Sequence, residues 1–267
     1  ILAASLGEAD IYFFDEPSSY LDVKQRLNVA RMIRELASSG KQVLVVEHDL
    51  AVLDYLSDYI YVIYGTPGAY GMVGNQKSTL NGINEFLNGF FKDENVRFRE
   101  KELHFNIRAA AKDAVASVVA KYPALQKSLG DFSLEAEGGE LRKGEVIGLV
   151  GPNGIGKTTL VKMFAAELKP DNTELDFSLK VAYKPQYLKP QKGILVSSLF
   201  ASGIDNSLFD LEIDRRLKVK KLFEKDLSQL SGGELQKVSI AYNLAIESDL
   251  ILLDEPSASI DVEDRLR

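Results

Sequence analysis

The chain has 267 residues, 45% of them hydrophobic, which is enough to bury one large core or two modest ones and argues against disorder. Its formal net charge of −7 argues against a protein that is basic throughout, as a simple nucleic-acid coat would be. No apolar run approaches the ~20 residues that cross a bilayer, so we expect a soluble, intracellular protein. The absence of cysteine excludes disulfides and thiolate metal sites in this stretch but bounds the compartment only weakly.

A segment near the start of the chain recurs near its end. Residues 11–22 and 250–261 share an apolar run followed by Asp-Glu-Pro-Ser, and Asp15 and Asp254 stand 239 positions apart. This spacing is too long for a solenoid repeat and suits two copies of a whole domain. We therefore expect the second half of one domain followed by most of a second copy.

Between the two copies, apolar runs of strand length alternate with segments of helical spacing, which predicts a mixed α/β fold. A helix is expected over 24–37, because its apolar residues fall on one stripe and Ser-Ser-Gly follows as a stop signal. The expected strands, most of which end at glycine, aspartate or glutamate, are 42–46, 59–64, 146–150 and 250–253.

Residues 65–95 differ in composition from their surroundings. They are rich in glycine and asparagine, with aromatic residues interleaved, which suits either a hinge between domains or an elaborated loop of the first one. Two basic runs are either solvated surface or contacts to a phosphate backbone. They consist of Arg97, Arg99, Lys101, Arg108 and Lys112, and of Arg215, Arg216, Lys218, Lys220, Lys221 and Lys225.

A glycine-rich loop follows the expected strand 146–150 and opens an expected helix over 159–167, which is the context of a P-loop. Glycines let successive N–H groups turn toward phosphates at a helix N-terminus. Lys157 would give a point charge to the phosphates and Thr158 a hydroxyl to Mg²⁺. The predicted nucleotide-binding loop is Gly151, Pro152, Asn153, Gly154, Ile155, Gly156, Lys157, Thr158 and Thr159.

The expected strand 250–253 ends in two acids. Asp254 would hold Mg²⁺ through water, and Glu255 would act as the general base for an attacking water. Such a pair is weak evidence alone but strong downstream of a P-loop. Phe132, upstream of the loop, suits stacking on adenine and packing in the core equally well.

A Leu-Ser-Gly-Gly-Glu run, residues 230–234, precedes a further stretch of helical spacing. Serine and glycine there suit a plain capped helix start. Placed between a P-loop and an Asp-Glu strand, however, the run resembles the ATP-binding-cassette family. The resemblance implies an α/β P-loop NTPase fold, with the second half of a first cassette over 1–63, a hinge over 64–99 and most of a second cassette over 100–267.

In that family two cassettes close head to tail, so that each ATP lies between the P-loop of one and the Ser-Gly-Gly turn of the other. The resemblance implies that Ser231, Gly232 and Gly233 contact a nucleotide held by the other cassette, as helix-terminal N–H groups can. It also implies that Gln186 senses Mg²⁺ and the attacking water.

By the same resemblance, the first copy carries its own catalytic group. Asp15 corresponds to the metal-binding acid and Glu16 to the catalytic base. His48 matches the family's switch histidine, which orients the γ-phosphate and water, and a structural histidine is the plain alternative.

Pairing the motifs head to tail leaves neither ATP site whole. The group of Asp15, Glu16 and His48 would meet the turn at Ser231, but its P-loop would lie before residue 1. The site of the visible P-loop would need a histidine near position 287 and a signature turn before residue 1. We therefore expect this stretch to bind nucleotide weakly and not to hydrolyse ATP at a useful rate by itself.

Segments 15–23, 46–58, 64–71, 82–89 and 95–99 closely resemble the ribosome-recycling ATPases, also called the RNase L inhibitor family. The resemblance implies a cytoplasmic factor that uses ATP and Mg²⁺ to split ribosomes, with the small ribosomal subunit and termination factors as partners and no membrane. It also implies an iron–sulfur domain outside these residues and ribosomal RNA near Arg97 and Arg99. The alternatives are an ATPase subunit of a transporter and a non-catalytic scaffold gated by nucleotide.

Overall fold

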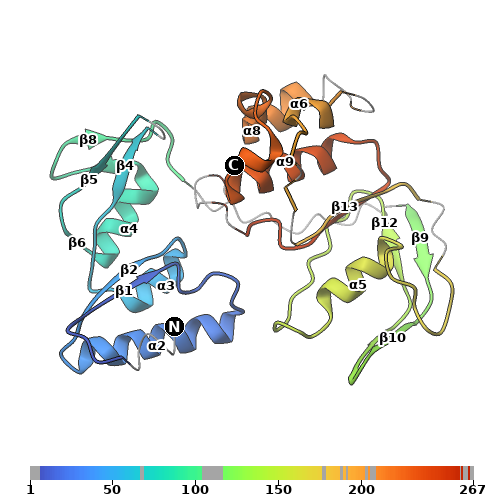
Figure 1. The fold of residues 1–267 in the computed structure, drawn as a ribbon, viewed down its shortest axis with the longest axis horizontal. Coiled ribbons are helices and arrows are strands. Elements are labelled where there is room, and N and C mark those ends of the chain that lie inside the picture. The colour runs from blue at the N-terminus through green and yellow to red at the C-terminus, as the bar shows by residue number, and fades with distance from the viewer. Residues whose placement is uncertain are drawn as a thin grey trace. The chain divides into compact units, whose positions relative to one another are not determined.

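The computed structural model describes residues 7–66, 69–103, 117–175, 179–186, 189–190, 192–201, 204, 209–258, 260 and 264. The chain forms two compact units, Ile1–Ile107 with Asp261–Leu266, and Arg108–Ile260 with Arg267. Figure 1 colours the first unit mainly blue and blue-green and the second green to red. Residues 64–99 belong to the first unit, and their role as a hinge stays a prediction. Arg108 and Lys112, from the first basic run, lie outside the described residues.

The first unit begins with a parallel pair of strands, β1 (Ile11–Asp15) and β2 (Gln42–Val46). Helices α2 (Val23–Ser38) and α3 (Leu50–Leu56) pack against the pair, and Figure 1 shows α2 running alongside it. The helix expected over 24–37 and the strand expected over 42–46 are therefore present. One face of the strands and the inner faces of both helices form a core of Tyr12, Phe14, Ala30, Ile33, Val52 and Leu56.

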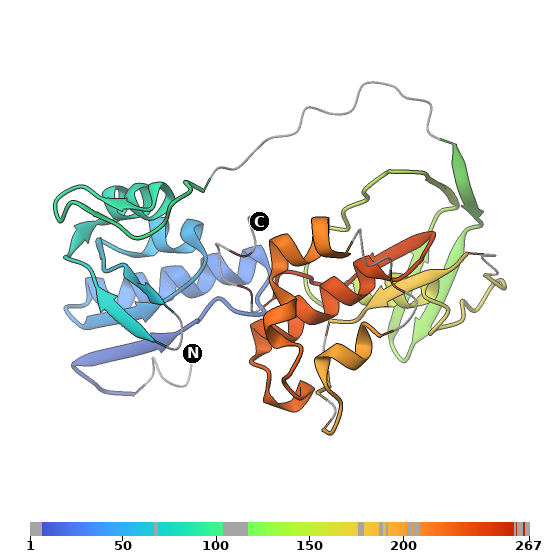
Figure 2. The ribbon, with the colours of Figure 1, turned by 90° about the horizontal axis from the view of Figure 1, so that it is seen from above.

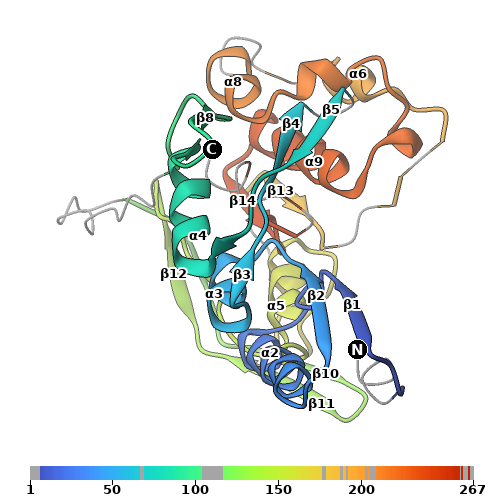
Figure 3. The same cartoon turned by 90° about the vertical axis from the view of Figure 1, so that its left-hand side faces the viewer.

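The remainder of the first unit consists of short antiparallel strand pairs around one helix, which Figure 3 shows beside β3. The strand expected over 59–64 is in fact two strands, because the chain leaves the first pair after Ile60 and enters the second at Ile63. The elements are β3 (Tyr59–Ile60) with β6 (Lys77–Ser78), β4 (Ile63–Thr66) with β5 (Tyr70–Val73), β7 (Phe90–Phe91) with β8 (Val96–Arg97), and α4 (Thr79–Asn88).

This part of the first unit is held by a buried ion cluster and an aromatic cluster. Lys77 is 6% exposed, and its ammonium lies 2.9 Å from a Glu94 carboxylate oxygen and 3.1 Å from one of Glu85. The Phe91 and Phe98 ring centroids are 4.5 Å apart. A buried charge is tolerated when it is paired and hydrogen-bonded, so the segment has a packed interior of its own.

The second unit joins an antiparallel part to a P-loop helix and a parallel strand pair. In Figure 2, α9 lies alongside β13 and β14, in agreement with the contacts between them. The strand expected over 250–253 is therefore present as β14. The elements are β9 (Val118–Tyr122) with β12 (Gly139–Arg142), β10 (Leu125–Leu129) with β11 (Phe132–Ala136), α5 (Lys157–Phe164), and β13 (Val181–Lys184) with β14 (Leu250–Leu253).

The strand expected over 146–150 is not formed, which corrects the sequence-based expectation. Val146 and Val150 are 95% and 97% exposed, and no strand is assigned there. A strand needs a hydrogen-bonded neighbour, and β14 pairs only with β13 among the described residues. In the first unit the corresponding strand, β1, is paired in parallel with β2.

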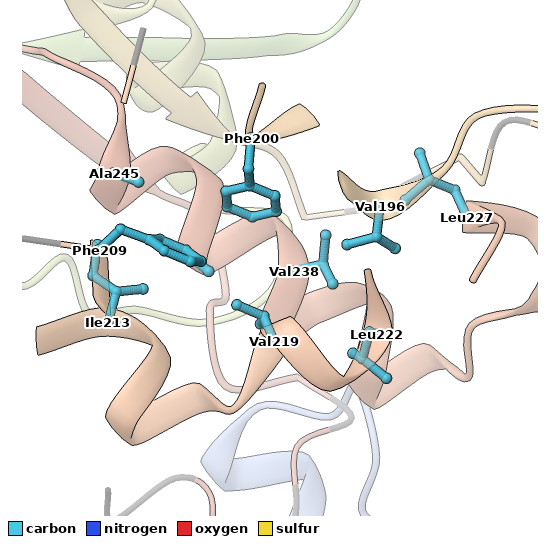
Figure 4. Packing of buried hydrophobic residues seen from close by; sticks show 10 residues of the cluster. Val196, Phe200, Phe209, Ile213, Val219, Leu222, Leu227, Val238 and Ala245 are labelled. Atoms are coloured by element: carbon cyan, nitrogen blue, oxygen red, sulfur yellow. The ribbon is translucent and has the colours of Figure 1, made fainter. Parts of the chain in front are cut away.

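A helical region of the second unit packs on α9 (Gly232–Ala245) and carries the larger core, part of which Figure 4 shows around Phe200 and Phe209. Apolar side chains converge there from several short helices and from one face of α9. The short elements are α6 (Val196–Leu199), a π-helix (Phe209–Asp214), α8 (Arg215–Leu217) and two 3₁₀-helices (Val219–Leu222 and Leu227–Gln229).

Candidate nucleotide site

The P-loop leads directly into α5, which begins at Lys157, two residues earlier than expected, and ends at Phe164. Gly156 has a φ of +101°, a left-handed conformation that glycine adopts at little cost. A side chain there would also meet the Phe132 ring at 2.9 Å. Gly156 is therefore required both by its backbone and by the close approach of Phe132, which packs against the P-loop.

The side chain of Lys157 folds back onto the start of the P-loop. Its ammonium donates hydrogen bonds to the carbonyl oxygens of Gly151 and Pro152, both at 2.7 Å. An ammonium group can exchange such carbonyl partners for phosphate oxygens without moving to another part of the protein. Lys157 is thus placed where the sequence predicts a phosphate-binding charge.

A side-chain hydrogen bond joins the first turn of α5 to the end of β14. The Thr158 hydroxyl donates a hydrogen bond of 2.7 Å to a carboxylate oxygen of Asp254, whose residue is only 6% exposed. Hydroxyl and carboxylate oxygens are suitable Mg²⁺ ligands. No group of three His, Cys, Asp or Glu side chains able to hold a metal occurs among the described residues, so a Mg²⁺ ion here would need phosphate oxygens and water as further ligands. The residues fit a nucleotide-bound Mg²⁺.

Gln186 and Glu255 flank this contact. Gln186 follows β13 by two residues and Glu255 follows β14 by two, and the two strands are parallel neighbours. Since the carboxyl ends of parallel strands meet at one sheet edge, both residues lie at the edge that carries Asp254. Glu255 has a φ of 46°, a conformation that non-glycine residues rarely adopt outside constrained sites.

The same backbone conformation recurs in the first unit. Glu16 has a φ of 44°, and its N–H donates to the Val46 carbonyl at 2.8 Å, which fixes the end of β1 to β2. The His48 Nε2 atom lies 3.0 Å from a Glu16 carboxylate oxygen. The structure thus brings Glu16 and His48 together beside Asp15, while their catalytic roles stay predictions.

Two site residues were not expected from the sequence. Glu47 organises the turn before α3, because its carboxylate accepts hydrogen bonds from the N–H groups of Ser18, His48 and Asp49. Lys184, at the end of β13, is completely buried beside Asp254. A lysine at the end of the run Val-Ala-Tyr-Lys, just before proline, is the signal that would have identified Lys184.

The signature turn is a helix cap in this structure. The Ser231 hydroxyl accepts the Glu234 N–H at 3.2 Å, and the Glu234 carboxylate accepts the Ser231 N–H at 2.9 Å and the Lys225 ammonium at 2.8 Å. Burial disfavours the Glu234 carboxylate, but the bonds from Lys225 and Ser231 outweigh it and lower the pKa of Glu234. Capping uses the Ser231 oxygen as an acceptor, so its hydrogen can still be donated to a phosphate. Gly232 and Gly233 form the first turn of α9.

The chain is similar to known proteins of one family. A family model described as "ABC transporter" matches residues 135–258. The chain is 51% identical over its whole length to an uncharacterized ABC transporter ATP-binding protein of Methanocaldococcus jannaschii, and 46% identical over 97% of its length to translation initiation factor RLI1 of Saccharomyces cerevisiae. It spans 44% of each of these two relatives.

Two solved structures match almost the whole chain. One is described as the archaeal ribosome recycling factor aABCE1 in complex with the archaeal ribosomal stalk protein aP1, with 53% identity, a TM-score of 0.86 and coverage of 99% of this chain and 52% of that one. The other is a model of ribosome-bound archaeal Pelota and ABCE1, with 54% identity, a TM-score of 0.91 and coverage of 98% and 45%.

A shorter relative establishes the subfamily. ABC transporter E family member 3 of Arabidopsis thaliana is 35% identical over 147 residues, which make up 51% of this chain and 81% of that protein. The signature turn, the P-loop and the two Asp-Glu strand ends are thus accompanied by similarity to E-family proteins. The chain belongs to the ATP-binding-cassette ATPases, in their E subfamily.

Proposed function

We propose that this chain is part of a longer twin-cassette ATPase that splits ribosomes into subunits. Its similarity to an archaeal ribosome recycling factor and to RLI1 supports the ribosome as the substrate. The observation that supports ATP as the energy source is the hydrogen bond between Thr158 and Asp254 beneath the P-loop. ATP with Mg²⁺ is the expected cofactor pair, and an iron–sulfur domain is expected only outside these residues.

Each motif then has a defined role in hydrolysis. Lys157 and the N–H groups of the P-loop hold the phosphates, and Glu255 accepts the proton of the attacking water. Bound Mg²⁺, held by Thr158, Asp254 and Gln186, would neutralise charge that develops on the phosphates. The Ser231 hydroxyl and the N-terminus of α9 contribute hydrogen bonds to a nucleotide on the opposite cassette.

The first unit supplies the corresponding groups of the other ATP site. Asp15 would serve as a metal-binding acid, Glu16 as the base, and His48 would orient the water that Glu16 activates. The 3.0 Å approach of His48 to Glu16 supports this pairing. Because each site needs a part outside these residues, we propose that the chain alone does not turn over ATP.

The proposed partners are the small ribosomal subunit and termination factors, and the proposed location is the cytoplasm. Solved relatives are described with Pelota on the ribosome and with a ribosomal stalk protein. Among the described residues, no helix is long and apolar enough to traverse a bilayer. A transporter subunit and a silent scaffold have no specific observation in their favour.

The test uses the longer protein that contains this chain, incubated with ribosomes and a termination factor and analysed on sucrose gradients. ATP should convert ribosomes to subunits, and the Glu16→Gln plus Glu255→Gln double variant should bind ATP but not release phosphate repeatedly. Catalytic-base loss typically costs about 10²–10⁴-fold in rate. Ribosomes that stay intact with the wild-type protein and ATP would contradict the proposal.

A further inference from the structure

A completely buried lysine lies beside the main chain of the Asp254–Glu255 turn in the second unit. Lys184 ends β13 and is 0% exposed. A charged ammonium at such a depth must be hydrogen-bonded to be tolerated. Its partners are main-chain carbonyls: Asp254 at 2.9 Å, Pro185 at 3.1 Å and Glu255 at 3.5 Å. All three belong to the two segments that carry Gln186 and the acid pair.

Lys184 is hydrogen-bonded to both the N–H and the carbonyl of Asp254. Its carbonyl accepts the Asp254 N–H at 3.0 Å, and its ammonium donates to the Asp254 carbonyl. Two hydrogen bonds from one residue fix both the position and the rotation of the Asp254 main chain. The carboxylate that leaves this main chain is the one that accepts the Thr158 hydroxyl at 2.7 Å.

We propose that Lys184 is a positioning residue of the nucleotide site, which aims Asp254 at Thr158 and ties the Gln186 segment to the Asp254–Glu255 turn. This inference rests on the proposed function, because it assumes that Thr158 and Asp254 bind Mg²⁺ with a nucleotide. The Lys184 ammonium is bonded to main-chain carbonyls, and we do not assign it as a ligand of the metal or the phosphates. Its hydrogen bonds orient the main chain that carries Asp254 and Gln186, in the way that residues hydrogen-bonded to metal ligands orient those ligands in other proteins.

The test measures the affinity of the chain for a fluorescent ATP analogue with Mg²⁺ and with EDTA. The ratio of the two dissociation constants reports how much of the binding depends on the metal. A variant that is only less stable has less folded protein in both conditions, so its ratio stays the same. Lys184→Met keeps an unbranched side chain one atom shorter and removes the three hydrogen bonds that the ammonium donates, while the main-chain bond to Asp254 stays. Lys184→Gln retains an N–H donor. Lys180→Met, which removes an exposed lysine just before the same strand, is the matched control.

We expect Lys184→Met to reduce the Mg²⁺ preference about tenfold, Lys184→Gln to reduce it less, and Lys180→Met to leave it unchanged. A Mg²⁺ preference within twofold of wild type in folded Lys184→Met overturns the inference. If Lys184→Met does not fold, the Mg²⁺ preference of Lys184→Gln is judged by the same twofold limit. If neither variant folds, Lys184 is needed for the fold itself, and the inference is overturned. Failure of the wild-type chain to bind the analogue would instead contradict the proposed function.

Discussion

At the scale of single residues, the site depends on a few side chains whose surroundings are fixed by neighbouring strands. Thr158 and Asp254 come from a helix and a strand that are 96 positions apart in sequence, yet their oxygens are within 2.7 Å. Glu16 and Glu255 share a rare backbone conformation in the two copies. The same turn geometry therefore follows the acidic strand end in both copies, at the glutamate that we propose as the base.

Tyr183 gives a prediction at this scale, because its hydroxyl is buried without a hydrogen-bond partner among the described residues. Burial, with the nearby carboxylates of Asp254 and Glu167, raises the pKa of Tyr183 to about 12. An unpaired buried hydroxyl costs free energy, so Tyr183→Phe should stabilise the second unit by about 1 kcal/mol in urea unfolding. Tyr242→Phe serves as the comparison, and a clear loss of stability in Tyr183→Phe would show that the hydroxyl has a partner.

At the scale of secondary-structure elements, the cap of α9 stabilises its helix and lies where we propose that a nucleotide binds. Ser231 and Glu234 form a reciprocal capping box, and Lys225 supports the glutamate. The same N-terminus carries the N–H groups and the helix dipole that favour a phosphate. One short motif therefore serves both the fold of its own cassette and the proposed site of the other.

Two substitutions at Ser231 separate these roles. Alanine is a poor N-cap and should cost about 1 kcal/mol of unfolding free energy, whereas glycine should cost only a few tenths, about 0.3 kcal/mol. Both remove the hydroxyl proposed to reach a nucleotide. In the longer protein, Ser231→Ala and Ser231→Gly should therefore lower ATP turnover by similar factors while differing in stability. If Ser231→Gly instead keeps nearly normal ATP turnover while Ser231→Ala loses it, as their stabilities do, the Ser231 hydroxyl serves only to cap the helix.

The sequence predicted elements well where local signals suffice. The helix at α2 has an apolar stripe, a capping Asp22 and a glycine stop at Gly40, and these are properties of the chain itself. The strand over 146–150 was predicted from its apolar run and was wrong, because a strand also needs a partner that the run does not encode. The P-loop lysine, the acid pairs and the histidine were predicted from motif order. Lys184 and Glu47 were missed, since their partners are main-chain groups.

At the scale of the whole molecule, the two compact units divide the proposed ATP sites between them. Asp15, Glu16 and His48 belong to the first unit, while the P-loop, Gln186, the signature turn and Asp254 with Glu255 belong to the second. The head-to-tail pairing expected for the family would combine groups from both cassettes in each site. The unit of function is therefore proposed to be larger than either compact unit.

Arg97, at the end of β8, and Arg99, just after it, lead to a prediction about ribosome binding. Arg97 is exposed over the Phe90 ring, whereas the Arg99 guanidinium donates to the carbonyls of Phe86 and Leu87 and is committed to the fold. Arg97→Glu in the longer protein should weaken ribosome binding and reduce its salt dependence, as loss of a phosphate contact does. Lys180→Glu, at an exposed ion pair with Glu247 outside both basic runs, is the control. Unchanged binding by Arg97→Glu would remove the RNA role.

The most direct test of the account is a calorimetric titration of this chain with ATP and Mg²⁺, combined with an assay for phosphate release. One P-loop and two incomplete composite sites predict one weakly bound nucleotide per chain and no steady phosphate release. Steady turnover that is abolished by Glu255→Gln would contradict the account, because it would mean that the groups within these residues already make a complete catalytic site.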